Sequence, residues 1–425
     1  MSAITAYRTL LRTVGPAYVL VAFLGRVPLA MSQMGTLLLV SQATGRYALG
    51  GAAAGALAVA NAVGAPFFGS LADRVGQRSV VLVQSVAGAA GLVAVVLVTE
   101  GEAPASVIIA TAALAGLATP QIGPLARVRW APVLRAAAGG GEEPRRGCRA
   151  GGGEEPRRGC RAGGGDESRL VDAAFSYEGA ADEVSFVLGP ATVGAVAVII
   201  DPGGAIMVAA VVLGAFGSWF ALHPTAALTV PDGSEPRSTT RVISALLVAL
   251  AVAQLLIGVL FGATQTGSAV LATEEGQPGM AGLIHATLGI GSAIAGLAVA
   301  ALPERIGYPS RMVVAAAGLL VLSTPLLLVQ SVAQLVVVIA LLGFAVAPYM
   351  ISNFAMAGQV VAPDRVGLAM TLLAGATGIG YALGSSIAGR LADLGGHTPA
   401  FAVTVTATAC AVLLSVGVAV RARTH

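Results

Sequence analysis

Twelve long apolar stretches constrain the fold of this chain more than any other feature of its sequence. A helix needs about 20 predominantly apolar residues to cross the hydrocarbon core of a bilayer, whereas transmembrane strands are about 10 residues long and alternate in hydrophobicity. The sequence therefore predicts an all-α polytopic membrane protein with 12 transmembrane helices and no large soluble domain. The stretches lie at about 17–41, 48–71, 79–99, 104–127, 182–200, 205–225, 242–265, 279–302, 310–329, 333–355, 366–390 and 398–420.

The composition excludes several classes of chemistry. All 24 basic residues are arginine, so the chain has no Walker A lysine for nucleotide-driven pumping and no lysine for a Schiff base. The four histidines and three cysteines form neither an HExxH nor a CxxC pattern, and a formal net charge of +3 is too small to suggest nucleic-acid binding. We therefore expect no enzymatic activity, no metal, no cofactor and no nucleic-acid partner.

The arginines predict the orientation of the chain in the membrane. If the N-terminus is cytoplasmic, 21 of the 24 arginines lie in inner segments. The outer loops hold only Arg46 and Arg390, and Arg26 lies within the first apolar stretch. Because basic residues accumulate on the cytoplasmic side, we expect both termini to be cytoplasmic, in a plasma or inner membrane.

A glycine-rich repeat interrupts the first half of the chain. The sequence AGGGEEPRRGCR occurs twice within 138–161, and glycine, proline and mixed charges cannot build a packed core. The repeat is either a partner-binding or membrane-surface segment or a tandem expansion without a role. The predicted organisation is 1–137 for helices 1–4, 138–171 for a disordered cytoplasmic insert, 172–228 for helices 5 and 6, 229–241 for a cytoplasmic linker, and 242–425 for helices 7–12.

An internal repeat divides the spans into two sets of six. The segment LADRVG at 71–76 follows the second stretch, and LPERIG at 302–307 follows the eighth, 231 residues later. Two halves with the same motif at the same inner turn are typical of the parallel repeats of transporters. The sequence thus predicts two six-helix pseudo-repeat bundles.

The segment GSLADRVGQR at 69–78 resembles the signature of the major facilitator superfamily between helices 2 and 3, G-x-L-x-D-R-x-G-R-R/K. Gln77 departs from it at a usually basic position. The resemblance covers the chain apart from the insert and implies a transporter of the drug- or sugar-efflux kind. It also implies a conformational-switch motif made of Gly69, Asp73, Arg74, Gly76 and Arg78, with Glu304, Arg305 and Gly307 in the second half.

The fifth stretch carries SFVLGPATVG at 185–194, which resembles the family's exporter-associated motif, G-x-x-x-G-P-x-x-G-G. Gly189, Pro190 and Gly194 are present, while Ser185 replaces the first glycine. In family terms this motif implies a bend that packs against the other half and is associated with antiporters. The alternative is a proline kink without directional meaning.

The same resemblance implies that helices 1, 4, 7 and 10 line a cavity. Their polar residues suit a fairly apolar solute with a few polar groups, although hydrogen bonding between helices is an equal alternative. We expect Arg26 to lie in a water-filled cavity and attract a carboxylate of the substrate, and Glu183 is the candidate for proton coupling. The predicted cavity residues are Arg26, Gln33, Gln121, Gln254, Gln265, Tyr349 and Asn353.

These features predict a secondary active transporter that exports small, partly apolar molecules by alternating access with proton antiport. Its expected partners are the lipid bilayer, a small-molecule substrate and protons, and we expect a monomer. An importer of the same fold, taking up a sugar or metabolite, is one alternative. A receptor or scaffold that transports nothing is another, but it should carry a folded soluble output domain.

Overall fold

A computed structural model describes residues 3–139, 162–229, 244–299, 306–361 and 366–423, and all regular secondary structure within these ranges is helical. Eleven of the described helices are long and apolar enough to cross a bilayer, and the shorter apolar helix at Met280–Gly296 is the twelfth. The all-α, 12-helix polytopic fold is therefore confirmed.

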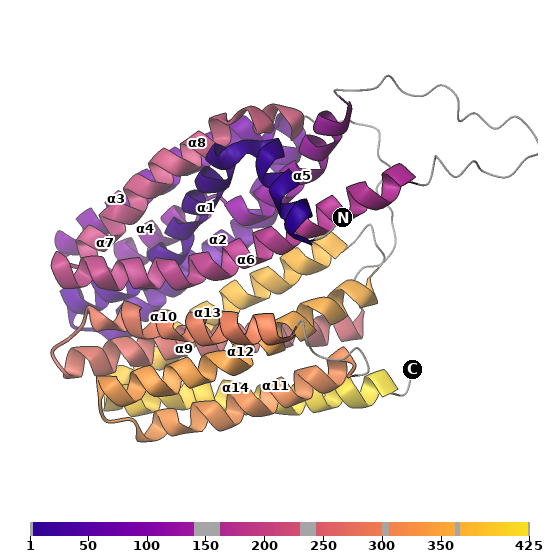
Figure 1. The fold of residues 1–425 in the computed structure, drawn as a ribbon. Coiled ribbons are helices and arrows are strands. Elements are labelled where there is room, and N and C mark those ends of the chain that lie inside the picture. The colour runs from indigo at the N-terminus through magenta and orange to yellow at the C-terminus, as the bar shows by residue number, and fades with distance from the viewer. Residues whose placement is uncertain (1–2, 140–161, 230–243, 300–305, 362–365, 424–425) are drawn as a thin grey trace, which may run out of the picture.

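The first half of the chain forms the upper set of helices in Figure 1. Its fourth span is broken between α4 and α5, and its sixth span contains a π-helical turn, Leu213–Gly217, between α7 and α8. The helices are α1 (Ala3–Thr44), α2 (Tyr47–Val75), α3 (Gln77–Glu100), α4 (Ala105–Ala118), α5 (Ile122–Gly139), α6 (Ala162–Ile199), α7 (Pro202–Val212) and α8 (Ser218–Leu222), followed by the 3₁₀ turn Pro224–Thr229.

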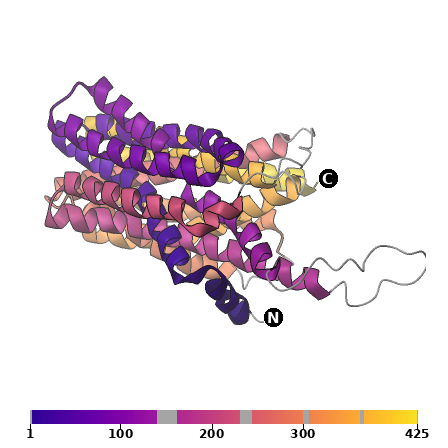
Figure 2. The same cartoon turned by 90° about the horizontal axis from the view of Figure 1, so that it is seen from above.

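The second half forms the lower set, and α1 begins at the same end of the molecule at which α14 ends (Figures 1 and 2). Its ninth span consists of α11 and the 3₁₀ turn Thr324–Leu328. The helices are α9 (Ala245–Glu274), α10 (Met280–Val299), α11 (Tyr308–Ser323), α12 (Val332–Val360), α13 (Val366–Gly395) and α14 (His397–Arg423).

The two halves meet through two helix pairs, α2 with α13 and α6 with α10, and glycine permits the approach. A β-carbon added at Gly51 of α2 would overlap the carbonyl oxygen of Ser385 of α13, and one added at Gly282 of α10 would overlap that of Pro190 of α6. Small residues allow helix backbones to approach this closely in lipid, where hydrophobic association is weak.

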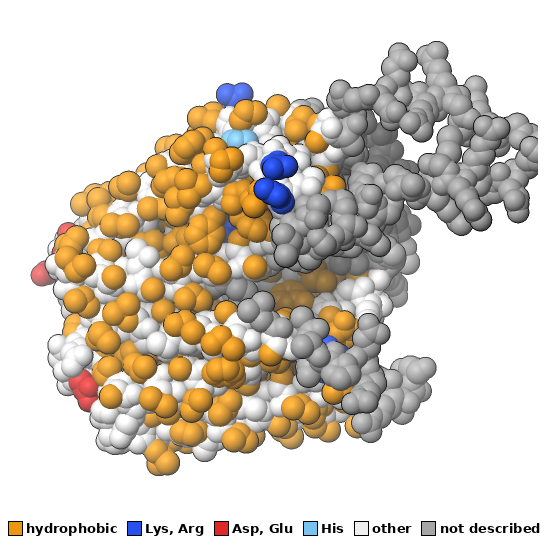
Figure 3. Space-filling view, viewed as in Figure 1, with side chains coloured by type: hydrophobic (Ala, Val, Ile, Leu, Met, Phe, Trp, Pro, Cys, Tyr) orange, Lys and Arg blue, Asp and Glu red, His pale blue; other side chains and the backbone are white. Residues whose placement is uncertain are grey.

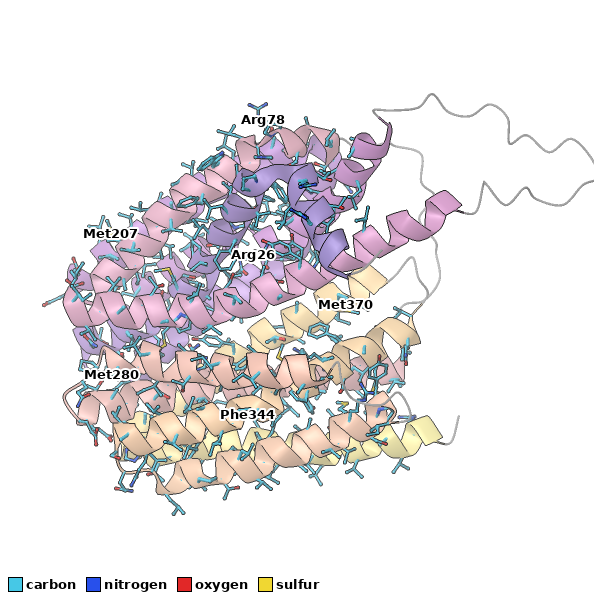
Figure 4. The ribbon with its side chains drawn as sticks, viewed as in Figure 1. Arg26, Arg78, Met207, Met280, Phe344 and Met370 are labelled. Atoms are coloured by element: carbon cyan, nitrogen blue, oxygen red, sulfur yellow. The ribbon has the colours of Figure 1, made fainter. Side chains whose placement is uncertain are left out.

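These contacts run from one end of the molecule to about the middle of the helices. They involve the early parts of α2 and α10 and the late parts of α6 and α13, whereas Gly69 and Gly375 have no neighbours in reach of a β-carbon. Met280, at the start of α10, lies at this sealed end, and Met370, near the start of α13, lies at the end where α1 begins (Figure 4). The surface is hollowed between the halves on that second side (Figure 3). The molecule is thus closed at the end remote from its termini.

Two parts of the predicted organisation differ from the structure or lie outside it. The helix α6 begins at Ala162, so residues 162–171, assigned to the insert, are helical, and the fifth helix starts 20 residues before the predicted 182. The repeat within 140–161, together with Glu304 and Arg305, lies outside the described residues.

Candidate functional site

A cluster of charged side chains lies buried inside the N-terminal half, where α1, α5 and α6 meet (Figure 4). Arg26 of α1 is only 6% exposed. Its Nη2 donates to Oε2 of Glu178 at 2.5 Å, its Nη1 donates to Oδ1 of Asp182 at 2.9 Å, and its Nε donates to the carbonyl oxygen of Ala22 at 3.0 Å. The guanidinium therefore bridges two carboxylates of α6 and does not face open space.

The fourth span completes this cluster. Arg127 Nη2 donates to Oδ2 of Asp182 at 2.6 Å, and Trp130 Nε1 donates to Oε1 of Glu178 at 2.7 Å. A β-carbon at Gly123 would lie 2.7 Å from Oδ1 of Asp182, so only glycine lets α5 approach this carboxylate so closely. Two arginines and two carboxylates balance in charge, which the low dielectric of a membrane interior demands. We call these four side chains the ion cluster.

The expectation of a water-filled cavity around Arg26 did not include these two carboxylates of the protein. That expectation placed the start of the fifth helix at 182, whereas α6 already includes Glu178. Glu178 and Asp182 are four residues apart and so share one helical face. Glu183 also lies on α6, but its side chain is outside what the structure describes. The i, i+4 spacing of the two acids was the signal in the sequence that pointed to a partner for Arg26.

A second arginine of the fourth span is buried among uncharged partners. Arg129 donates from Nε to Oε1 of Gln77 at 2.8 Å and from Nη1 to the carbonyl oxygen of Phe220 at 2.8 Å, and its guanidinium lies 3.6 Å from the centre of the Phe220 ring. These bonds join the start of α3 to the end of α8. They also give a reason for glutamine at position 77, because a basic side chain there would repel Arg129 instead of accepting its hydrogen bond.

The break in the fourth span is bridged by a side chain from α2. Asn61 Nδ2 donates to the carbonyl oxygens of Gly116 and Thr119 at 3.0 and 2.8 Å, and its Oδ1 accepts from Nε2 of Gln121. A broken helix within a membrane needs such partners for its freed carbonyls. Gln121 therefore binds Asn61 in this conformation.

Among the described residues of the C-terminal half, the buried polar side chains include no arginine, aspartate or glutamate. Asn353 Nδ2 of α12 donates to Oε1 of Gln254 of α9 at 2.8 Å, and the Tyr381 hydroxyl of α13 donates to Oε1 of Gln265 at 2.7 Å. Gln254 Nε2 and Asn353 Oδ1 have no hydrogen-bond partner among the described residues. Tyr349 is also buried, and Gln33 of α1 is half-buried. The predicted cavity residues thus form separate groups, and only Gln254 and Asn353 bond to each other.

A carboxylate of the C-terminal half caps a helix of the N-terminal half at the sealed end. The backbone N–H groups of Tyr47 and Ala48, the first residues of α2, donate to Oδ1 and Oδ2 of Asp393 of α13 at 2.8 and 3.0 Å. Free N–H groups and the helix dipole make this terminus electropositive. Ser385 Oγ adds a bond to the carbonyl oxygen of Gly51 at 3.1 Å. We call the contact of Asp393 with α2 the outer cap.

The outer cap has a sequence signal that the motif search missed. The string G-x-L-A-D occurs at 69–73, near the end of α2, and again at 389–393, near the end of α13. The two helices run antiparallel, since Tyr47 lies beside Gly389 and Ala62 beside Gly378. Each aspartate therefore lies at the end of the pair where the other helix begins.

Comparison with known proteins finds one family whose profile matches the second half of the chain. The family profile described as Major Facilitator Superfamily matches residues 250–424. The crystal structure of the nucleoside transporter NupG is similar, with a TM-score of 0.66 at 15% identity over 95% of this chain and 98% of that chain. The second half of the chain is thus similar to the major facilitator superfamily, and the whole chain shares the fold of this solved transporter. The chain therefore has the multi-pass fold of a membrane transporter.

Two further superfamily structures share the fold. The human organic anion transporter MFSD10 (TETRAN) has a TM-score of 0.55 at 18% identity, covering 94% of this chain and 100% of that chain. A POT family transporter in complex with a thioalcohol conjugated peptide has a TM-score of 0.62 at 11% identity, covering 96% of both chains. No curated protein sequence matches the chain. Identities this low carry the fold and not the substrate.

The superfamily motifs occupy the expected turns. Gly76 joins α2 to α3 with a φ of 91°, a conformation that favours glycine. Arg74 and Arg78 are exposed beside it, and Gly307 caps the start of α11. Asp73 lies in the last turns of α2, but its side chain is outside the described part of the chain. The switching role of this motif stays a prediction.

The helix-5 motif lies on α6 at two interfaces. Gly189 packs against Ala30 of α1, and Gly194 packs against Leu283 of α10 and against Gly279 just before it, in the other half. Pro190 lies between them within the helix. The motif is therefore part of the sealed end, and its meaning for transport direction stays a prediction.

Proposed function

We propose that this transporter exports small, partly apolar molecules across the cell membrane by alternating access, in exchange for protons. The observation that carries the proposal is the seal at the end remote from the termini, formed by the outer cap and the glycine contacts of α6 with α10. With the termini in the cytoplasm, as the arginine distribution favours, the open end faces inward. An exporter loads its substrate in this conformation, and the helix-5 motif favours export over uptake.

The coupling acid is proposed to lie on α6. Glu183 is the candidate from the sequence, and Glu178 and Asp182 join it because they are ionisable groups within a membrane span. Glu178 is fully buried and held by Arg26 and Trp130, whereas the Asp182 side chain is 29% exposed. A proton carrier must reach water, so Asp182 is favoured over Glu178 and stands beside Glu183 as a candidate.

Substrate recognition is proposed to combine an anionic and a neutral subsite. Gln254 Nε2 and Asn353 Oδ1 are a donor and an acceptor without described partners, and a polar group of a substrate would satisfy both. Arg26 can bind a carboxylate of the substrate only if Asp182 or Glu178 releases it.

The switch motif is proposed to close the inner end. The antiparallel register that places Tyr47 beside Gly389 and Ala62 beside Gly378 brings Asp73 to the start of α13, near Val366, when the inner ends meet. There it would cap α13 as Asp393 caps α2. Asp73→Asn should therefore cut transport severely and leave membrane insertion unchanged, and near-normal turnover would assign the motif to topology alone.

Transport direction is tested in everted and right-side-out vesicles with a panel of partly apolar dyes, with and without a collapsed proton gradient. We expect accumulation in everted vesicles that is lost when the gradient collapses, and loss of this effect in Asp182→Asn. Accumulation in right-side-out vesicles would instead establish the importer. If no dye moves in either kind of vesicle, and if Asp73→Asn behaves like the parent in this assay, the result would favour the receptor or scaffold.

Orientation is tested separately with reporter fusions. Fusions after Thr99 and Gln277 should report the outside, and fusions after Pro236 and Thr424 the cytoplasm. An external signal after Pro236 would contradict the arrangement of two halves with cytoplasmic ends. This measurement does not depend on the substrate, so its failure and a failure of the export proposal can be told apart.

A further inference from the structure

A recess of about 670 Å³ lies on the outside of the N-terminal half, where the beginning of α1 passes Tyr177 of α6. It is lined by residues of α1 that face away from the helix contacts: Leu11 and Leu20 are 46% and 50% exposed. Tyr177 of α6 forms part of its wall. The beginning of α1 projects beyond the neighbouring helices when the molecule is viewed from above (Figure 2). The recess therefore opens toward lipid and not toward the interface of the two halves.

The local sequence builds this recess by bending α1. Gly15 has a φ of 78° and interrupts the helix, and Pro16 follows it. The segment before the bend is fixed to the protein, because Leu10 and Val14 are buried in one apolar cluster with Trp130. The bend thus holds a short helical segment in a defined place, and its outward face turns toward the recess.

The chemistry of the recess changes from one end to the other. Arg8 and Arg12 lie on the segment before the bend, four residues apart and therefore on one helical face, and both are exposed. Beyond the bend, the lining continues with apolar side chains that include Leu20 and Phe23. The described lining residues include no acid. Two cationic side chains thus lie near the beginning of α1, and an apolar surface lies beyond the bend, further along the same helix.

We propose that this recess binds one anionic phospholipid. Arginine holds phosphate with charge-assisted, bidentate hydrogen bonds, so the headgroup is placed between Arg8 and Arg12. An acyl chain then lies along Leu20 and Phe23, parallel to α1. This order of charge and hydrocarbon matches a lipid in its leaflet, whereas a soluble anion would leave the apolar lining unused. The leaflet is the cytoplasmic one if the proposed orientation holds, but binding itself depends on neither orientation nor transport direction.

The site lies next to the ion cluster. Tyr177 precedes Glu178 on α6, and its ring meets Trp130 edge-on at 6.3 Å between centres. A lipid against Tyr177 therefore stabilises the packing of α1 on α6 that the pair of Arg26 and Glu178 also holds. We expect bound lipid to raise the melting temperature of the full-length protein.

The test compares binding of dioleoyl phosphatidylglycerol and dioleoyl phosphatidylcholine to the purified full-length transporter in detergent, by native mass spectrometry and by thermal melting. The double variant Arg8→Gln with Arg12→Gln should bind phosphatidylglycerol roughly 30-fold more weakly, because each arginine near an anionic lipid surface contributes about a fivefold preference. The matched control, Arg46→Gln with Arg390→Gln, removes two exposed arginines at the sealed end and should bind like the parent.

Two further variants keep the result decisive. Arg8→Lys with Arg12→Lys keeps both charges and should retain most of the preference even if the glutamine variant folds poorly. Leu20→Ser should weaken binding and reduce the melting shift, since it removes the hydrocarbon contact. Equal binding of the two lipids by the parent, or equal phosphatidylglycerol binding by the parent and the glutamine variant, would overturn the proposal. An unchanged affinity of Leu20→Ser for phosphatidylglycerol would also overturn it. The lipid would then bind through its charge alone, without the apolar lining of the recess.

Discussion

The two halves share one helical plan, yet they satisfy their buried polar side chains differently. The N-terminal half buries formal charges: Arg26 and Glu178 inside the ion cluster, and Arg129 among uncharged partners. The C-terminal half buries amides and hydroxyls, with Gln254 bonded to Asn353 and Gln265 bonded to Tyr381. The described contacts of the ion cluster stay within one half, so they hold α1, α5 and α6 together and do not join the halves.

This difference predicts which substitutions should lower the stability of the fold and which should change transport. Removing one member of a buried ion pair leaves a charge without compensation and costs about 3–5 kcal/mol, whereas an unsatisfied neutral group costs about 1–3 kcal/mol. The N-terminal half should therefore respond to substitution with loss of the folded state. The C-terminal half should tolerate neutral replacements and reveal them in substrate affinity.

The largest effect is expected for Glu178→Gln. This change leaves Arg26 and Arg127 with one carboxylate between them, and the destabilisation of about 3–5 kcal/mol should sharply lower the melting temperature of the detergent-purified protein and its abundance in the membrane. The double variant Glu178→Gln with Arg26→Gln restores charge balance, because Asp182 keeps Arg127, and it should recover most of the lost stability. A double variant that is no better than the single one would show that charge balance is not what the cluster provides.

A smaller effect is expected for the neutral pair. Asn353→Leu and Gln254→Leu should each cost at most about 1–3 kcal/mol, and the double replacement should be close to neutral because both polar groups leave together. If the pair contacts substrate, the double variant should melt like the parent and yet transport with a KM raised about tenfold. Thr264→Val, which breaks the separate bond to Thr404, is the matched control within α9. A double variant with parental kinetics would remove the pair from the substrate site.

A still smaller effect is expected for the outer cap, in which the charged side chain of Asp393 contacts the other half. Asp393→Asn weakens the outer cap by about 0.3–1 kcal/mol, which shifts the balance of conformers roughly two- to fivefold toward the state that is open at the end sealed here. Distances between spin labels at Glu102→Cys and Gln330→Cys, in a chain whose own cysteines are replaced by serine, report this shift. Asp201→Asn is the control: Asp201 caps Gly204 of α7 at 2.7 Å within one half, so the labels should keep their parental distances.

The smallest effect is expected for deletion of one repeat copy, residues 138–149. The only apolar side chains of this copy are those of Ala138, Pro144 and Cys148. They are too few and too small to form a packed contact with either half, so abundance, melting temperature and transport rate should match those of the parent. A transport defect at normal abundance would show that the N-terminal half depends on a segment outside its helices. The same deletion can be read in the vesicle assay used for transport direction.

The sequence allowed prediction of the spans more fully than of the contacts between them. Twelve apolar stretches and the motif at 69–78 were enough for the helix count and the family resemblance, because span length and turn chemistry are local properties. The partners of Arg26 were missed because hydropathy marks Glu178 as the end of a span, while helix formation continues through it. The bond of Gln77 to Arg129 and the bridge of Asn61 across the broken helix depend on tertiary packing, which no local pattern records.

The outer cap has an evolutionary consequence. Its acceptor is the side chain of Asp393, but its donors are the main-chain N–H groups of Tyr47 and Ala48. Every residue except proline supplies that donor, so mutations at 47 and 48 can accumulate without any compensating change at 393. Relatives that keep this contact should preserve the aspartate alone, beside two freely drifting positions. Searches for co-varying residue pairs would therefore overlook this link between the halves, however many sequences were compared.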